Sequence, residues 1–123
     1  MTSKKKDIKW PEGPVKLSDE DFDAFVKDHP KVVVDCWADW CGPCRKLGPV
    51  IKELAGVHKG EIAFGKLDVD ENDKVSDRYG VRGIPTLLVF QDGEHVDTLV
   101  GYRGRSELEK ELLEEFGNGG DGQ

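Results

Sequence analysis

The feature that most constrains the fold is the seven-residue run KVVVDCW at positions 31 to 37. A strand with one face in water alternates apolar and polar residues, whereas this run is almost continuously apolar and β-branched. Such a run is typical of a central strand that is buried on both faces of its sheet, which requires helices on both sides. A few residues further on, two cysteines, Cys41 and Cys44, stand one helical turn apart. The run therefore predicts an α/β domain with a pair of thiols directly after its central strand.

The remaining hydrophobic pattern alternates between strand-like and helix-like segments. The predicted strands are Val15–Leu17, Lys31–Trp37, Ile62–Val69, Thr86–Gln91 and Glu94–Val100, and the predicted helices begin near Ser18, Cys41, Asn72 and Ser106. This order of elements predicts a central mixed β-sheet of four to five strands, flanked by helices on both faces.

Local signals mark several ends of these elements. Ser18 and Ser106 are expected as N-caps of the first and last helices. The acidic residues after Ser18 interact favourably with the positive N-terminal end of the helix dipole. Asp92 and Gly93 predict a tight hairpin between the last two strands. Pro49 lies inside the long helix and is expected to kink it.

The length of 123 residues fits one domain that buries its own core. We expect residues 1–14 to form a flexible N-terminal extension, residues 15–116 the folded domain, and residues 117–123, rich in glycine, a disordered tail. No internal repeat is visible.

Charge and hydropathy exclude several function classes. The net charge is −7, and because residues 1–9 carry +3, the rest of the chain carries −10, which argues against nucleic-acid binding. The longest apolar runs, such as Pro85 to Phe90, are too short to span a membrane. The N-terminal lysines precede no apolar stretch, so we expect no secretory signal and a cytoplasmic location.

Three interpretations of the cysteine pair differ in what they require. A structural disulfide across three residues stabilises the fold by only about 1.9 kcal/mol in the chain-entropy model. A zinc site needs four ligands, but Cys36 and the three histidines repeat no ligand spacing, so no metal is expected. A redox pair explains more of the sequence, because a C-x-x-C at a helix start places both sulfurs on one face of the first turn.

Within the redox interpretation, the two cysteines have different surroundings. Cys41 is expected at the helix terminus, where unpaired N–H groups and the helix dipole stabilise a thiolate. Cys44 is expected one turn further in and more deeply buried. Pro43 lacks an N–H that would be unpaired there anyway.

Four motifs occur in order along the chain: VVVDCWADWCGPCRKLGP, GKLDVD, YGVRGIPTLLVF and LVGYRG. Together they resemble the thioredoxin family over roughly residues 15 to 116. The resemblance implies a thioredoxin-like fold and a thiol-disulfide oxidoreductase that reduces protein disulfides. It also implies no bound cofactor, because the transferred electrons reside in the two sulfurs.

The resemblance further assigns roles to individual residues. It implies that Cys41 attacks the substrate disulfide and that Cys44 resolves the mixed disulfide, leaving a Cys41–Cys44 redox disulfide. Asp35 matches the buried carboxylate that assists proton transfer at Cys44, and its apolar neighbours predict a raised pKa. Lys66 matches the lysine that faces this aspartate. Pro85 matches a cis-proline opposite the active site.

A substrate-binding surface around Cys41 follows from the same resemblance, in which the backbone of Ile84 pairs with an extended peptide. Its expected members are Trp40, Gly42, Pro43, Ile84, Val100 and Gly101. The expected partners are disulfide-containing substrate proteins and a thioredoxin reductase, either NADPH-flavin or ferredoxin-linked, and the protein is expected to be a monomer.

The sequence departs from the family pattern at two places. Cys36 stands where a bulky apolar residue is usual, and we expect it to pack as a small hydrophobic residue, with redox regulation as the alternative. Tyr102 and Arg103 are bulkier and more charged than expected and could narrow partner choice. The alternative function is a thioredoxin-like binding module or a specialised electron carrier with a narrow partner set.

Overall fold

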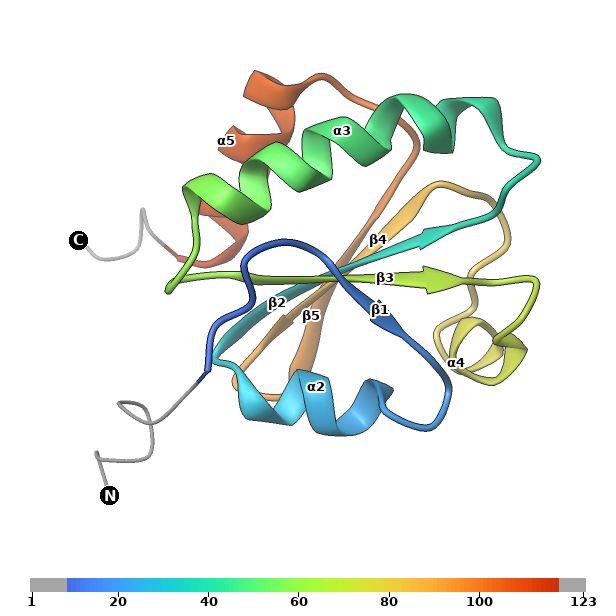
Figure 1. Cartoon of the computed structure of the whole chain (residues 1–123), viewed down its shortest axis with the longest axis horizontal. Coiled ribbons are helices and arrows are strands. Elements are labelled where there is room, and N and C mark those ends of the chain that lie inside the picture. The colour runs from blue at the N-terminus through green and yellow to red at the C-terminus, as the bar shows by residue number, and fades with distance from the viewer. Residues whose placement is uncertain (1–8, 118–123) are drawn as a thin grey trace.

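A computed structural model describes residues 9–117 of the chain. Its nine elements form a five-stranded sheet with helices on both faces (Figure 1). The strands are β1 (Val15–Leu17), β2 (Lys31–Trp37), β3 (Ala63–Asp68), β4 (Thr86–Gln91) and β5 (Glu94–Val100), and the helices are α2 (Phe22–Asp28), α3 (Gly42–Val57), α4 (Asp73–Arg78) and α5 (Arg105–Glu115).

Strand β2 lies in the centre of the sheet, whose strand order is β1-β3-β2-β4-β5. It pairs in parallel with β3 and antiparallel with β4, while β1 adds in parallel to β3 and β5 antiparallel to β4. Helices α3 and α5 cover one face of the sheet, and α2 and α4 cover the other (Figure 1). The predicted mixed sheet with helices on both faces is therefore confirmed.

The two covered faces explain why β2 lacks alternation. Val33 belongs to the cluster under α3 and α5, whereas its neighbours Val32, Val34 and Cys36 belong to the cluster under α2 and α4. All four side chains are fully buried. Because successive side chains of a strand point to opposite faces, positions 32 to 36 are all buried, and all but Asp35 carry apolar side chains.

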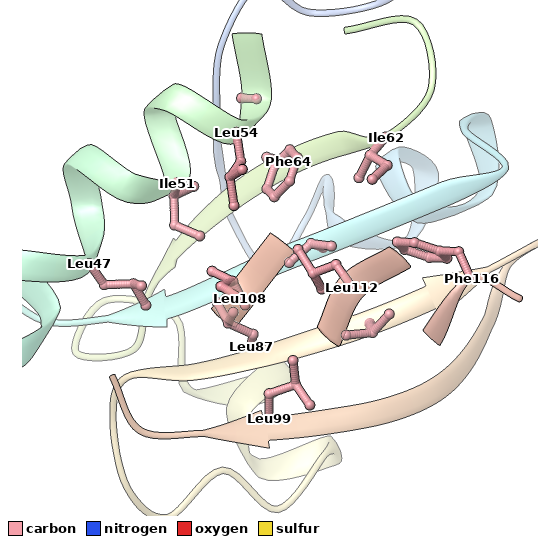
Figure 2. Packing of buried hydrophobic residues seen from close by; sticks show 13 residues of the cluster. Leu47, Ile51, Leu54, Ile62, Phe64, Leu87, Leu99, Leu108, Leu112 and Phe116 are labelled. Atoms are coloured by element: carbon pink, nitrogen blue, oxygen red, sulfur yellow. The ribbon is translucent and has the colours of Figure 1, made fainter. Parts of the chain in front are cut away.

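One apolar cluster lies between the sheet and helices α3 and α5, where leucines from both helices meet the strands (Figure 2). Its members include Leu47, Ile51, Leu54, Phe64, Leu87, Leu99, Leu108, Leu112 and Phe116. Burying such side chains stabilises the fold by about 1.5–3 kcal/mol each, so this layer fixes α3 firmly on the sheet.

Two of the predicted helix starts need correction. Helix α2 begins at Phe22 with Asp21 as N-cap, so the prediction that Ser18 caps it is wrong. Ser18 instead belongs to the turn before the helix, where the Asp21 N–H donates to its Oγ at 3.4 Å and its own N–H donates to Asp21 Oδ1 at 2.7 Å. Helix α5 begins at Arg105 with Gly104 as N-cap, so the prediction that Ser106 caps it is wrong. Ser106 lies inside the first turn instead.

The hairpin between β4 and β5 is confirmed. Asp92 and Gly93 both have positive φ angles, of 53° and 84°. Positive φ at both central residues is the requirement of a type I′ turn, whose twist matches that of the flanking strands.

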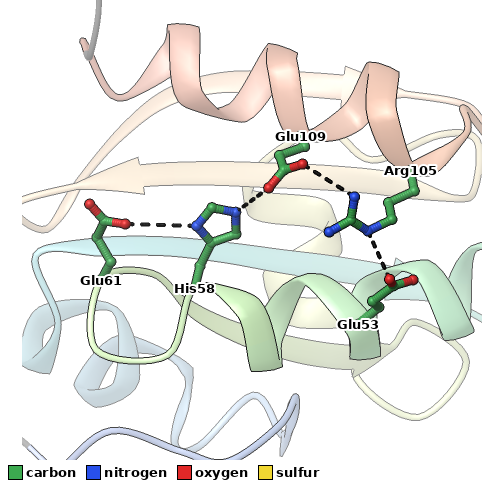
Figure 3. Close-up of polar contacts among 5 residues, drawn as sticks. All are labelled: Glu53, His58, Glu61, Arg105 and Glu109. Atoms are coloured by element: carbon green, nitrogen blue, oxygen red, sulfur yellow. Dashed lines mark hydrogen bonds and ion pairs between the residues drawn. The ribbon is translucent and has the colours of Figure 1, made fainter.

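A chain of hydrogen bonds and ion pairs among His58, Glu109, Arg105 and Glu53 joins the end of α3 to α5 (Figure 3). His58 Nε2 lies 2.7 Å from Glu109 Oε2, and Arg105 contacts both Glu109, at 3.4 Å, and Glu53 of α3, at 3.0 Å. Glu61 lies 3.7 Å from the other ring nitrogen of His58. His58, one of the three histidines that repeat no metal-ligand spacing, therefore links two helices.

The segment before β1 has no regular secondary structure from residue 9 to residue 14, but it packs on the domain. Trp10 contacts the core cluster of α2 and α4, and its ring centre lies 5.3 Å from that of the buried His29. The predicted extension and tail fall partly on residues 1–8 and 118–123, which lie outside the described residues. None of the helices between residues 9 and 117 has the length and apolar character needed to cross a membrane.

Candidate active site

The two cysteines stand where β2 leads into α3. Cys41 is the N-cap of the helix and has an extended backbone, and Cys44 lies one turn along, with their Cα atoms 5.2 Å apart and a disulfide between them. Pro43 occupies the first turn, where its missing N–H leaves nothing unpaired. The N–H of Cys44 donates to Cys41 Sγ at 3.2 Å, and the same bond would stabilise a Cys41 thiolate in the reduced protein.

The prediction that Cys44 is more buried than Cys41 is wrong, since both residues have an exposed fraction of 4%. What distinguishes the two sulfurs is their surroundings. Cys41 is the N-cap and its sulfur receives the N–H of Cys44, whereas Cys44 lies inside the first turn of the helix.

The loop before β4 closes one side of the cysteine pair. The Ile84–Pro85 peptide bond is cis, as predicted, and the carbonyl oxygen of Ile84 lies 3.7 Å from Cys41 Sγ. The carbonyl oxygen of Pro85 accepts the N–H of Gly101 at 2.8 Å. Residues 84, 85 and 101, which are far apart in sequence, therefore meet beside Cys41.

Asp35 is a buried carboxylate on β2, on the sheet face covered by α3. Strand alternation gives it the same face as Val33, and its exposed fraction is 1%. Neither carboxylate oxygen has a hydrogen-bond partner among the described residues. Burial raises the pKa of Asp35 to about 6, and the positive charge of Lys66 opposes this shift.

Lys66 is the register partner of Asp35 on β3, as the resemblance implied, and its side chain is half-buried. Its ammonium lies 4.7 Å from the ring centre of Trp37. Lys66 is therefore held by an aromatic ring and acts on Asp35 through space, without an ion pair between them.

The expected surface around Cys41 contains large exposed apolar side chains. Trp40 is 68% exposed and Val100 is 64% exposed, and Gly42 and Pro43 are also exposed, while Ile84 and Gly101 are half-buried. Trp40 is fixed by a hydrogen bond from its Nε1 to Asp70 Oδ2, of 2.9 Å. Sequence reasoning missed Asp70, because a pairing across 30 positions leaves no local signal.

Arg103 is a second residue whose place the sequence did not predict. Its Nη1 donates to the carbonyl oxygens of Val100, at 3.2 Å, and Gly101, at 2.8 Å. Its Nε lies 2.6 Å from Glu111 Oε1 of α5. The loop after β5 is thereby tied to a helix.

Cys36 lies apart from the redox pair. Its side chain is fully buried among Val34, Leu88 and other residues under α2 and α4, on the opposite face of the sheet from Asp35. Burial, and then the charge of Asp35, raises the pKa of its thiol to about 12. The environment is that of a packed hydrophobic residue.

Two adjacent sulfurs at a helix start can exchange one disulfide for two thiols when one side is open to a second disulfide. The disulfide at the start of α3 and the exposed side chains of Trp40 and Val100 provide these features, which define the class of dithiol–disulfide exchange proteins.

Comparisons with known proteins agree. A family model described as Thioredoxin matches residues 13–114. A thioredoxin of Staphylococcus epidermidis is 48% identical over 98 residues, covering 80% of this chain and 93% of that protein. Thioredoxin 2 of Chlorobaculum tepidum is 46% identical over 101 residues, covering 81% and 93%.

Among solved structures, a mutant thioredoxin from Halobacterium salinarum superposes with a TM-score of 0.79 at 39% identity, covering 85% of this chain and 92% of that one. The chain belongs to the thioredoxin family. It is a thiol-disulfide oxidoreductase that reduces protein disulfides.

Proposed function

We propose that this protein is a general, monomeric electron carrier of the cytoplasm and that Cys41 is the sulfur that attacks substrate disulfides. The observation that carries the assignment is the hydrogen bond from the Cys44 N–H to Cys41 Sγ, 3.2 Å long, at the start of α3. This bond and the helix dipole stabilise negative charge on Cys41, while Cys44 sits inside the first turn.

The reaction proceeds in two exchanges. The Cys41 thiolate attacks one sulfur of the substrate disulfide, which forms a mixed disulfide and releases the other substrate sulfur as a thiolate that takes up a proton. Cys44 then loses its proton and attacks Cys41 Sγ, which breaks the mixed disulfide. The substrate leaves with two thiols, and the protein holds the Cys41–Cys44 disulfide seen in the structure.

Asp35 serves as the proton acceptor for Cys44 in the second exchange. A carboxylate with a pKa of about 6 is ionised at neutral pH and is still a stronger base than an exposed aspartate. Lys66 is a positioning residue, because its charge keeps this pKa from rising further.

The substrate docks on Trp40, Pro43 and Val100, with its backbone against the loop of Ile84 and Pro85. Exposed apolar groups around a reactive sulfur support this, because large exposed side chains of this kind mark interaction sites. The disulfide is reduced again by a thioredoxin reductase, NADPH-flavin or ferredoxin-linked, which would use the same surface.

An insulin-disulfide reduction assay with dithiothreitol tests the proposal, with the wild type compared with Cys41→Ser and Cys44→Ser. We expect fast turnover by the wild type and none by either variant. Cys44→Ser, unlike Cys41→Ser, should capture several substrate proteins as mixed disulfides that dithiothreitol releases. Capture through Cys44 in the Cys41→Ser variant would contradict the assigned order of attack, and a single captured partner would favour a specialised carrier.

A further inference from the structure

A shallow depression lies directly beside the cysteine pair, and its lining is mainly apolar. Gly42, Pro43 and Lys46 of α3 line it from one side, and Tyr102 of the loop after β5 lines it from the other. Tyr102 is 46% exposed, so its ring lies at the surface and forms one wall of the depression. Because Gly42 and Pro43 directly follow Cys41 in the chain, the depression lies next to the reactive cysteine.

The wall is held in place before a substrate arrives. Arg103, the next residue after Tyr102, donates to the carbonyl oxygens of Val100 and Gly101 and forms an ion pair with Glu111 of α5. The Arg103 side chain is only 17% exposed, which shields this pair from water. The loop that carries Tyr102 is therefore preorganised, and a bound side chain would not have to order it.

The rim of the depression carries one uncompensated positive charge. Lys46 is exposed and forms no ion pair with any carboxylate among residues 9–117. The neighbouring Arg103 is neutralised by Glu111. The chain as a whole has a net charge of −7, but a Debye length of about 8 Å at physiological salt limits the reach of distant carboxylates. Close to the depression, the local charge of Lys46 dominates.

Lys46 and Cys41 lie on different sides of the start of α3. They are five positions apart, so a rise of about 1.5 Å and a rotation of about 100° per residue separate them by roughly 7.5 Å along the helix axis and about 140° around it. Gly42 and Pro43, which also line the depression, directly follow Cys41. An extended peptide advances about 3.3 Å per residue. Two residues of such a peptide span about 6.6 Å, so a side chain within two residues of the substrate cysteine can reach a depression whose lining begins at Gly42.

We propose that this depression is a specificity subsite, which selects substrate proteins with a glutamate or aspartate within two residues of the attacked cysteine. The methylene groups of that side chain pack on Pro43 and the Tyr102 ring, while its carboxylate faces the ammonium of Lys46. The proposal rests on the proposed function, in which Cys41 makes the attack, and it adds a substrate class to it.

Synthetic peptide disulfides test the subsite. Three peptides are made that differ only in a Glu, Gln or Lys placed two residues before the cysteine, and three with that residue two positions after it. The second-order rate of oxidation of the reduced protein is measured at physiological salt. Each rate is divided by the rate with hydroxyethyl disulfide, a small neutral molecule, which corrects for any change at Cys41 itself.

In at least one of the two series, we expect the wild type to prefer Glu over Gln by about two- to fivefold, the range of exposed charge pairs, and to disfavour Lys. Lys46→Glu should reverse the preference. Lys52→Glu, an equal change of charge at an exposed position of the same helix, should keep it. Tyr102→Ala should lower the preference, and Tyr102→Phe should retain it.

Equal corrected rates for all peptides of both series would overturn the subsite, as would a preference that Lys46→Glu leaves intact. Such results would leave the proposed function standing, because the wild type would still reduce the peptides through Cys41. A wild type that reduces neither insulin nor hydroxyethyl disulfide would instead overturn both proposals.

Discussion

Asp35 and Lys66 are register partners on the parallel strands β2 and β3, yet the Lys66 ammonium lies over the Trp37 ring and forms no ion pair with the carboxylate. Both oxygens of Asp35 are also without a hydrogen-bond partner among the described residues. The attraction of Lys66 therefore offsets only part of the cost of burial, and the pKa of Asp35 is about 6. This incomplete compensation makes Asp35 a titratable group near neutral pH.

The first prediction concerns stability. The pKa of Asp35 rises from 3.8 to about 6 on folding, so the folded state binds more protons between these pH values. Protonated Asp35 stabilises the folded state fully below pH 4. This stabilisation is lost as the pH rises through 6, and the loss amounts to about 3 kcal/mol by pH 8. Since Asn resembles the protonated acid, Asp35→Asn should match the wild type at pH 4 and be about 3 kcal/mol more stable at pH 8.

Urea unfolding of the oxidised protein at several pH values measures this difference. Lys66→Met is the complementary variant, because removal of its charge should move the midpoint of the stability change above pH 6. Parallel curves for the wild type and Asp35→Asn would show that Asp35 is not the group that titrates.

The second prediction concerns the release of substrate. If Asp35 takes the proton of Cys44, then Asp35→Asn should slow the resolution of a Cys41 mixed disulfide with thionitrobenzoate at pH 7 by roughly tenfold or more. The wild-type rate should rise with pH through about 6 and then level, following the carboxylate form, and the variant should lack this step. Stopped-flow absorbance follows the released thionitrobenzoate.

The rate of the initial attack by Cys41 on the reagent serves as the internal control, because Asp35 is assigned no part in that step. Equal resolution rates in the two proteins would remove Asp35 from the proton transfer.

Much of the fold could be predicted because its signals are local. The apolar run of β2 fixes a strand with two covered faces, and the Asp92-Gly93 pair fixes the hairpin. The prediction for Ser106 failed because a serine near a helix start can also lie in the first turn, and Gly104 takes the cap position here.

The site was predictable only where a motif carried it. The cysteine pair and the cis bond before Pro85 follow from sequence, but the contact of Trp40 with Asp70 does not. The same holds for Arg103 and Glu111, which come from a loop and a helix. Such pairs form only once sheet order and helix placement are known.

The third prediction concerns Cys36. In the oxidised protein it is the one free thiol, and it is fully buried with its pKa raised to about 12. Because the thiolate is the reactive form, a maleimide should leave Cys36 unmodified in the native protein and modify it after unfolding in urea. Mass spectrometry of the intact chain measures the added label. Rapid labelling under native conditions would revive a redox role for this cysteine.

The last prediction compares two polar side-chain contacts that differ in burial. The pair of His58 and Glu109 joins α3 to α5, and its side chains are 13% and 25% exposed, whereas those of Lys59 and Glu12 are 43% and 86% exposed. Loss of a partner at a shielded site leaves a polar group unsatisfied, whereas at an exposed site water replaces the lost partner.

Glu109→Ala should therefore lower the free energy of unfolding by about 1 kcal/mol or more, because Arg105 also loses a contact. Glu12→Ala should change it by less than about 0.5 kcal/mol. Urea unfolding at constant pH measures both, and equal losses would mean that the network in Figure 3 adds nothing beyond an exposed pair.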